Sequence, residues 1–438
     1  MRSPSVSPVP PIRSRPRLLA DLTPLRASPD YRRLWIGQSF ANVGAQLAVV
    51  AVGLQVYDLT GSSFSVGLVG LFALVPLVVL GLYGGALVDA HDRRRVALLA
   101  SLGLWVAAVA FAVQAWLGLD SVWLLYGLVA VQSAAFAINS PARLAILPRL
   151  LPTSQLPAAN ALSTLSWNVG FTVGPLMAGF LVAHVGYGLT YTVDAVTLAV
   201  ALWSLRRLPP LPPLGEVRRA GLASVLEGFT FLRTRPNVRM TFLVDLAAMM
   251  LASPRALFPA VGAVVLGGGA TTVGLLFTAV AVGSMLAGVL SGPLGAVRRQ
   301  GAVTCVAVAL WGACIAAFGV VLALAPPVPA DGSVSGAVWF AAVALAGAGA
   351  ADAVSAVFRT TILQSATPDA MRGRLQGVFI VVVAGGPRLG DVLLGTLGEH
   401  VGEAAASVAG GLACVVAVAL LARWQRGFLR YDARHPTP

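Results

Sequence analysis

Charge is scarce in this sequence. Charged residues make up only 11% of the 438 residues, whereas hydrophobic residues make up 57%. A soluble globular chain usually carries about a quarter charged residues. Apolar stretches of about 20 residues recur along the chain instead, each long enough to cross about 30 Å of hydrocarbon as a helix. The composition predicts a multi-pass membrane protein and excludes a soluble enzyme, a nucleic-acid-binding domain and a secreted disulfide scaffold.

Lysine is absent, and all 30 basic residues are arginine. The chain therefore lacks a GxxxxGKS or GxxxxGKT phosphate-binding loop and cannot be an ATPase of that type. Its three cysteines, Cys305, Cys314 and Cys414, lie in apolar stretches at spacings that match neither a metal site nor a disulfide framework. The four histidines are far apart, and no HExxH motif occurs. We expect no cofactor, no metal and no enzymatic activity.

Twelve apolar stretches predict an all-α integral membrane protein with twelve transmembrane helices. The expected spans are residues 34–57, 64–88, 96–117, 122–139, 160–183, 188–205, 240–260, 271–293, 302–324, 337–358, 376–397 and 404–423. The resulting domain organisation is a disordered cytoplasmic tail at 1–30, a six-helix bundle at 31–205, a cytoplasmic linker at 206–237, a second six-helix bundle at 238–424 and a cytoplasmic tail at 425–438.

The connections between the expected spans alternate in arginine content. Every second connection, starting with 58–63, contains no arginine, whereas the others and the two tails hold nearly all of them. An excess of arginine marks the cytoplasmic side of a membrane. Both termini are therefore expected inside the cell, which an even number of spans also requires.

The two predicted halves share a repeated pattern. Arg143, Ile146, Leu147 and Pro152, after the fourth span, recur 216 residues later as Arg359, Ile362, Leu363 and Pro368, after the tenth. Two parallel six-span halves, with the substrate path between them, explain this repeat. The repeated arginines are expected to be cytoplasmic charges that form pairs.

The linker between the halves has a pattern of its own. It opens with a proline-rich stretch at 206–213, which favours an extended chain. Apolar residues at helical spacing follow, with arginines behind them, and predict a short helix lying in the membrane interface. These residues are Leu222, Val225, Leu226, Phe229 and Leu232.

The connection after the second span reads Gly84-Gly-Ala-Leu-Val-Asp-Ala-His-Asp-Arg-Arg-Arg95. It resembles the signature loop of the major facilitator superfamily. The resemblance implies the twelve-helix fold of that superfamily, in which Gly85 permits close helix approach. It also implies that Asp89 latches the outward-open state across the two halves, with Arg93 and Arg94 as the positive end. Ala90 and Asp92 depart from the family pattern, which leaves the strength of the latch open.

A second motif lies in the fifth span. Gly170, Gly174, Pro175 and Gly179 form a pattern similar to the GxxxGPxxGG motif of exporters in this superfamily, with Ala178 in place of one glycine. Glycines four residues apart provide a flat face for close helix contact, and proline removes one backbone donor and bends the helix. Small-residue packing without any role in export is the alternative interpretation.

Further strings narrow the resemblance. The stretches 141–148, 254–259, 367–374 and 385–391 resemble the enterobactin exporter family of siderophore efflux proteins, although related drug exporters share several of them. The resemblance covers about residues 30–425. It implies export of a catecholate siderophore or similar amphipathic metabolite from a bacterial cell, across the inner membrane.

Charged residues inside the expected spans are candidates for ion coupling, because each costs roughly 2.5–3.5 kcal/mol at mid-span. Burial raises the pKa of a carboxyl group in general, which suits reversible protonation. We expect Asp245 or Asp352 to carry a coupling proton, with Arg255 and Arg388 as the charges that tune it. Structural pairing between spans is the alternative. The full set is Asp194, Asp245, Arg255, Asp352, Arg388 and Asp391.

Neutral polar residues also follow helical stripes. Amide side chains facing lipid would leave polar groups unpaired, so these residues are expected to face either a water-filled cavity or another helix. An aromatic wall in the fifth span could hold a ring-bearing substrate. The cavity candidates are Gln38, Asn42, Gln46, Gln132, Asn139, Trp167 and Asn168.

These patterns favour a secondary active exporter that works by alternating access and takes its energy from protons. A multidrug antiporter coupled to protons would share every feature, and a membrane sensor or scaffold without transport is a further alternative. The expected partners are a small-molecule substrate, the proton and the lipid bilayer, without nucleic acid. One chain is expected to suffice as a monomer.

Overall fold

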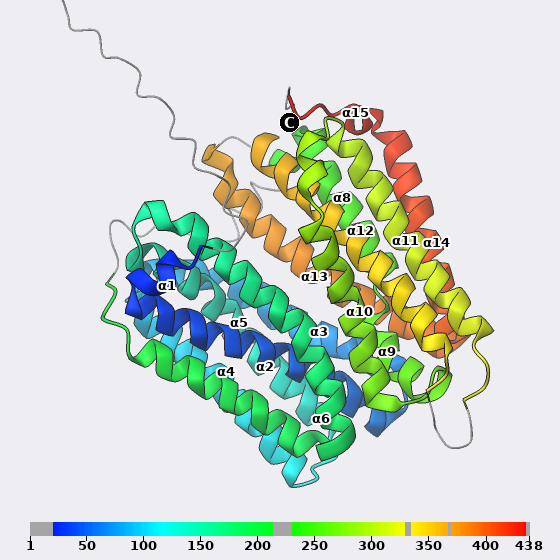
Figure 1. The fold of residues 1–438 in the computed structure, drawn as a ribbon, viewed down its shortest axis with the longest axis horizontal. Coiled ribbons are helices and arrows are strands. Elements are labelled where there is room, and N and C mark those ends of the chain that lie inside the picture. The colour runs from blue at the N-terminus through cyan, green and yellow to red at the C-terminus, as the bar shows by residue number, and fades with distance from the viewer. Residues whose placement is uncertain (1–20, 213–229, 329–333, 367–368, 435–438) are drawn as a thin grey trace, which may run out of the picture.

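The computed structural model describes residues 21–212, 230–328, 334–366 and 369–434, and this part of the chain is helical, with no strand. Figure 1 shows two bundles of long helices, one from each half of the sequence. The helices are α1 (Thr23–Ala27), α2 (Pro29–Thr60), α3 (Ser63–Ala90), α4 (Arg93–Trp116), α5 (Val122–Leu150), α6 (Leu156–Arg206), α8 (Pro236–Leu251), α9 (Phe258–Ala260), α10 (Gly269–Val289), α11 (Gln300–Leu324), α12 (Ala337–Ala366), α13 (Asp369–Val401), α14 (Glu403–Trp424) and α15 (Arg426–Leu429).

Ten segments of the described chain are long and apolar enough to cross a membrane. One of them contains α6, which runs for 51 residues and breaks at Gly186, where φ is 77°. Glycine adopts this left-handed conformation without the penalty that a Cβ imposes. The two parts of α6 correspond to the fifth and sixth expected spans, and α13, with 33 residues, corresponds to the eleventh. The arrangement is consistent with the twelve spans expected from sequence.

Short polar residues start several helices. The Ser28 side chain accepts a hydrogen bond from the Tyr31 backbone N–H, and Ser62 and Ser121 begin α3 and α5 in the same way. Asp92 caps α4 by accepting from the Arg95 backbone N–H at 3.0 Å. Such caps satisfy donors that a helix leaves open at its N-terminus, and they place the helix starts in or next to the expected connections.

The helices alternate in direction, so their connections gather at two ends. We call the end with connections 91–92 and 151–155 the arginine-rich end; the labels of α1 and α15 lie at this end of their bundles in Figure 1. The opposite end, with connections 61–62 and 117–121, is the arginine-poor end. Helices α5 and α12 run on to Leu150 and Ala366 at the arginine-rich end, well beyond the expected span limits.

Large apolar side chains cover the outside of the bundles. Trp123 is 74% exposed, Phe340 70% and Leu99 70%. A water-soluble protein rarely exposes apolar area on this scale, whereas hydrocarbon accepts it. The outside of the bundles is therefore suited to contact with lipid.

Two helix pairs make the most extensive contacts between the halves in the part of the chain that the structure describes. Helix α3 packs along α13, and α6 packs along α10. Within the halves the most extensive contacts are α2 with α6 and α11 with α14. The largest buried cluster includes Leu345 and Phe318 of the C-terminal half and continues to Leu47 and Ala178 of the N-terminal half. The two halves therefore share one buried core.

The ordered part begins earlier than the expected boundary at residue 30. Residues 1–20 lie outside the described chain, but α1 begins at Thr23 and α2 at Pro29. Tyr31 is 1% exposed, and its hydroxyl donates to the Ala159 carbonyl at 3.1 Å. This contact ties the start of α2 to the arginine-rich end of α6, which the composition of the tail did not reveal.

The linker and the C-terminal tail also pack on the bundles. Leu208 and Leu211 are buried against the N-terminal half. Leu232 is buried against Val238 and Ala366, so this residue of the expected interfacial helix contacts protein. The other four apolar residues of that helix, 222, 225, 226 and 229, lie outside the described residues.

The tail after α14 returns to the bundle. Phe428 and Tyr431 are fully or almost fully buried. Arg298 and Asp432 form an exposed ion pair at 2.9 Å. The expected tail at 425–438 is thus ordered along its first part, because its aromatic side chains fill the arginine-rich end of the C-terminal half.

Close packing of α11 on α14 gives a test of the fold. A Cβ at Gly411 would lie 2.5 Å from the backbone nitrogen of Ala316, whereas a Cβ at Gly288 would have no atom within 4 Å. Overpacking of this kind costs about 1 to 3 kcal/mol. Gly411→Ala is therefore expected to lower the melting temperature of the purified protein, and Gly288→Ala to leave it unchanged or raise it. Equal melting temperatures for the two variants would contradict the packing described.

Candidate functional site

An ion-paired triad lies inside the C-terminal half. The Arg359 guanidinium contacts the Asp245 carboxylate through Nη1 and the Asp352 carboxylate through Nη2, the second at 3.3 Å. The Asp245 side chain is 7% exposed and that of Arg359 is 13% exposed, whereas the Asp352 side chain is 33% exposed. One cation thus neutralises two acids, and only one of these acids is substantially accessible.

Two helices build this triad. Asp352 and Arg359 lie seven residues apart on one face of α12, and Asp245 comes from α8, which packs against α12. We expected Arg255 and Arg388 to be the charges that tune these acids. The arginine that contacts both acids is Arg359. Spacing along one helix shows which of its residues share a face. It contained no information on which helix lies opposite, so the pairing with Asp245 was missed.

Arg255 and Arg388 instead accompany Asp391. Helix α8 ends at Leu251 and a 3-10 turn, Pro254–Leu257, follows, so the seventh span is interrupted. Ser253, in this interruption, donates through Oγ to Asp391 Oδ1 at 3.2 Å. Both arginines act electrostatically on Asp391. This second charged cluster lies where α13 packs against α3 of the other half.

The repeated arginines have different surroundings. Arg143, which corresponds to Arg359, donates to Asn139 Oδ1 at 2.7 Å and to Ser101 Oγ at 3.2 Å. Asn139 in turn donates to the Ala97 carbonyl and to Ser101. No carboxylate among the described residues contacts Arg143. The two arginines at corresponding positions of the repeat therefore differ in their partners.

The expected cavity residues divide into two groups. Asn42 is 6% exposed and donates to Ser166 Oγ at 3.0 Å, and Gln38 donates to Asn42 at 2.8 Å. Together with Asn139, Asn42 therefore takes part in hydrogen bonds between helices, which was the alternative interpretation. The other group keeps some exposure: Gln38, Gln46, Gln132, Trp167 and Asn168.

The glycines of the fifth span lie at close helix contacts. A Cβ at Gly170 would lie 2.9 Å from the carbonyl carbon of Asn42, and one at Gly174 would lie 2.6 Å from Cβ of Gln46, both on α2. A Cβ at Gly179 would lie 3.0 Å from Cα of Gly274 in α10, and Pro175 contacts the same glycine through its carbonyl. The motif therefore packs against its own half and against the other half at once.

Part of the expected latch lies outside the described side chains. Gly85 and Asp89 belong to α3, but their side chains are not described. Arg93 donates to the Ala145 carbonyl at 3.3 Å, and Arg94 donates to the carbonyls of Leu205 and Arg206. Cations at the C-terminus of a helix interact favourably with its dipole. In this conformation the two arginines therefore hold helices within the N-terminal half.

Asp92, a departure from the family pattern, has a local role. Besides capping α4, its carboxylate accepts from the Leu211 backbone N–H at 2.9 Å. It thus joins the start of α4 to the linker between the halves. Glycine, which the family pattern prefers here, has no side chain to make either bond.

The sequence profile of a family described as transmembrane secretion effector matches residues 19–431. The chain belongs to this family. This chain is 30% identical to enterobactin exporter EntS of Citrobacter koseri, over 97% of its own length and 98% of the relative's. It is also 30% identical to enterobactin exporter EntS of Shigella boydii, over 92% and 93% of the two chains.

Solved structures share the fold. A POT family transporter in complex with 5-aminolevulinic acid has a TM-score of 0.71 at 11% identity, over 92% of this chain and 97% of that one. The nucleoside transporter NupG has a TM-score of 0.69 at 13% identity, over 92% and 99%. The fold of this chain is that of a major facilitator superfamily transporter. The protein is a multi-pass membrane transporter and not an enzyme.

The halves of the transporter meet at the arginine-poor end. A Cβ at Gly67 of α3 would lie 2.5 Å from the Asp391 carbonyl oxygen, and one at Gly395 would lie 2.5 Å from the Ser63 carbonyl oxygen. Ser63 also donates to Glu403 at 3.2 Å. Toward the arginine-rich end of the same helix, a Cβ at Gly81 would have no atom within 4 Å. The α3–α13 contact is therefore closest at the arginine-poor end.

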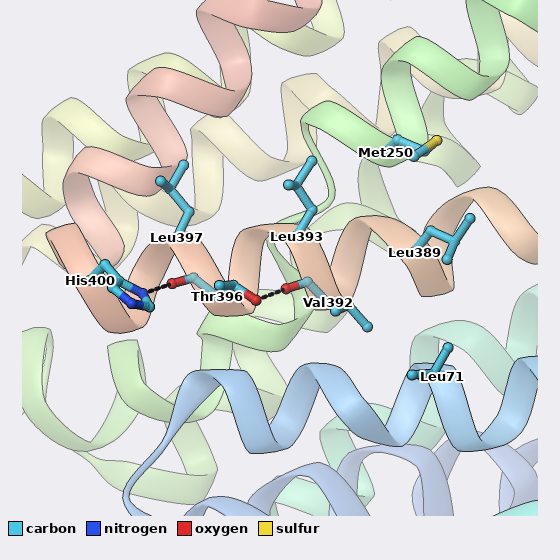
Figure 2. A pocket seen from close by; sticks show the side chains of 8 residues that line it. All are labelled: Leu71, Met250, Leu389, Val392, Leu393, Thr396, Leu397 and His400. Atoms are coloured by element: carbon cyan, nitrogen blue, oxygen red, sulfur yellow. Dashed lines mark hydrogen bonds between the residues drawn. The ribbon is translucent and has the colours of Figure 1, made fainter.

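A groove on the outside of this contact has a different character. Figure 2 shows Leu71 of α3 and Met250 of α8 beside a row of α13 side chains that includes Leu393. The groove has a volume of about 630 Å³. Its polar groups are satisfied within α13, because Thr396 donates to the Val392 carbonyl and His400 bonds the Thr396 carbonyl. It suits an apolar chain and not a polar substrate.

The triad gives a prediction on stability. Arg359→Gln leaves two carboxylates without their cation, and breaking a buried pair costs about 3 to 5 kcal/mol. The variant is expected to melt well below the wild type. The double variant Arg359→Gln with Asp245→Asn removes one orphaned charge and should recover part of the loss. Additive effects of the two substitutions would show that the residues do not interact.

The α3–α13 contact gives a prediction on conformation. Gly67→Leu places a side chain against the α13 backbone and is expected to separate the halves at the arginine-poor end. The measurement is the distance between spin labels at positions 60 and 401, in a background without the native cysteines. Gly81→Leu on the same helix is the matched control and should leave the distance distribution as in the wild type. An unchanged distribution in Gly67→Leu would argue against this contact.

Proposed function

We propose that this protein is a proton-coupled exporter of a siderophore, of the enterobactin type or a similar amphipathic metabolite. It would work by alternating access between its two halves. The observation that carries the proposal is the Arg359 triad, where one buried cation faces two acids that differ in accessibility. The substrate class rests on relatives that are enterobactin exporters by name.

The orientation follows from the charges. Because arginine accumulates on the cytoplasmic side, the arginine-rich end faces the cytoplasm of a bacterial cell and both termini lie inside. The contacts of Gly67 and Gly395 then close the external end, as in an inward-open transporter. The substrate would enter from the cytoplasm between the halves, which one chain provides as a monomer.

Within the triad, Asp352 is the better proton carrier. Its side chain is 33% exposed and its bond to Arg359 is 3.3 Å long, so water can deliver a proton to it. Asp245 is 7% exposed and stays paired with Arg359. With Asp352 charged, the triad has a net charge of one negative unit, and with Asp352 protonated it is neutral. When the transporter closes and the triad is buried in apolar surroundings, the desolvation free energy is smaller for the neutral triad than for the charged one.

Other candidates complete the scheme. Asp391, with Arg255 and Arg388, adjoins the contact between the halves, so that opening of the external end would hydrate it. The partly exposed polar residues Gln38, Gln46, Gln132 and Asn168, with the aromatic Trp167, are proposed to line the substrate path. Asp89 is proposed to latch the outward-open state together with Arg93 and Arg94, which would then leave the backbone carbonyls they bind here.

Secretion tests the proposal directly. An enterobactin-producing host that lacks its own exporter should release intact enterobactin again when it expresses this protein. Asp352→Asn is expected to return secretion to the level of the empty vector, because the triad can no longer gain or lose the coupling proton. The measurement is mass spectrometry of the medium, with membrane expression confirmed for each variant.

The control is Asp120→Asn, an exposed acid at the arginine-poor end, which should secrete as the wild type does. Wild-type secretion by Asp352→Asn would remove that residue as the proton carrier. No secretion by the wild type, despite expression, would contradict the siderophore proposal. Raised resistance to drugs in the same host would then favour a multidrug antiporter.

A further inference from the structure

A buried acid in the N-terminal half takes no part in the proposed triad. Asp194 of α6 is 0% exposed, and neither of its carboxylate oxygens has a hydrogen-bond partner. A carboxylate that is buried away from solvent, without a donor or a cation beside it, is strongly disfavoured in an apolar interior. The protonated, neutral acid avoids the cost of burying a charge. The surroundings of Asp194 therefore favour a bound proton.

No cation lies near this acid in the described structure. Asp194 Oδ1 and Thr197 Oγ1 both point to Gly44 of α2, where the missing side chain leaves them room. Tyr191, one turn away on α6, interacts with Asp194 electrostatically. The charged residues of the helices packed around it lie toward the helix ends, except His184, which lies beside the Gly186 break in α6. They are Asp30, Arg32, Arg33 and Asp58 on α2, Arg93, Arg94 and Arg95 on α4, and His184 and Arg206 on α6.

A line of polar groups leads from the arginine-poor end toward Asp194. Asp58 is exposed there and accepts a hydrogen bond from the Tyr187 hydroxyl. The rings of Tyr187 and Tyr191 stack with centroids 6.4 Å apart. The Tyr191 hydroxyl donates to Gln55 Oε1 at 2.9 Å. Tyr187, Tyr191 and Asp194 share one face of α6, because they are spaced by four and three residues.

The line is anchored by a buried amide pair. Gln114 of α4 donates to Gln55 at 3.0 Å, and Gln55 donates back at 3.3 Å. Gln55 and Gln114 are 5% and 2% exposed. The pair holds Gln55 in place as the acceptor for Tyr191. Side chains of α2, α4 and α6 therefore hold this polar line in place.

We propose that Asp194 is a second proton-binding site, in the N-terminal half, reached from the arginine-poor end along Asp58, Tyr187 and Tyr191. The proton comes from water at that end, and only O–H bonds form and break. The role of this proton in transport rests on the proton coupling proposed above. Its presence at Asp194 does not, so it can be measured without substrate or secretion.

Infrared spectroscopy of the purified full chain at neutral pH tests proton occupancy. A protonated carboxyl group has a C=O stretching band that a carboxylate lacks. Asp194→Asn is expected to lose the intensity of one carboxylic acid, whereas Asp120→Asn should match the wild type. An Asp194→Asn spectrum with the full band would overturn the proposal. If that variant does not fold, Asp194→Glu should keep the band and shift it, and an unshifted band would overturn the proposal equally.

Hydrogen–deuterium exchange of the same band tests the route. In deuterated buffer the Asp194 band shifts as its proton is replaced. Tyr187→Phe and Tyr191→Phe are expected to slow this shift several-fold. Tyr126→Phe is the matched control, because its hydroxyl bonds the Ser65 carbonyl outside the line, and it should exchange as the wild type does. Equal exchange in all three variants would exclude the proposed route. Secretion can fail while these results hold, so the two proposals remain separable.

Discussion

Helices that share a bilayer gain little from hiding apolar side chains from one another, because lipid is as apolar as leucine. Close approach of backbones must supply the attraction instead, and in this protein glycine provides it. Gly312 and Gly411 bring α11 and α14 together, and Gly179 and Gly274 bring the two halves together. The same requirement shapes the conformation. Gly67 lies close to the α13 backbone at the arginine-poor end, whereas Gly81 has no such neighbour among the described residues.

Three ionisable side chains within this apolar framework differ in their hydrogen-bond and ion-pair partners. Arg359 pairs with two carboxylates, and Arg143 donates to neutral acceptors. The Asp194 carboxylate has no hydrogen-bond partner among the described residues. The three situations differ in how readily a proton changes the local charge balance. At the triad a proton changes the net charge of an ion-paired group. At Asp194 a bound proton removes an isolated charge altogether.

The repeated arginines, Arg143 and Arg359, have different partners in the two halves. The repeat preserved an arginine near the arginine-rich end of α5 and α12. In the C-terminal half this arginine meets Asp245 from a neighbouring helix. In the N-terminal half the corresponding cation is held by Asn139 and Ser101. A common scaffold thus supports an ion-paired group on one side and a neutral hydrogen-bonded group on the other.

The sequence by itself determined the membrane class, the order of the spans and the repeat, because hydrocarbon thickness and helical rise set the length of each apolar stretch. It also located the glycine motif, which depends on spacing along one helix. Only the tertiary structure decided that Arg359 reaches Asp245, that Arg255 accompanies Asp391, and that Gln55, Gln114 and Tyr191 form one network. These contacts join residues far apart in the chain, and their partners depend on how helices rotate and cross when they pack. Spacing within one helix carries no information about that rotation.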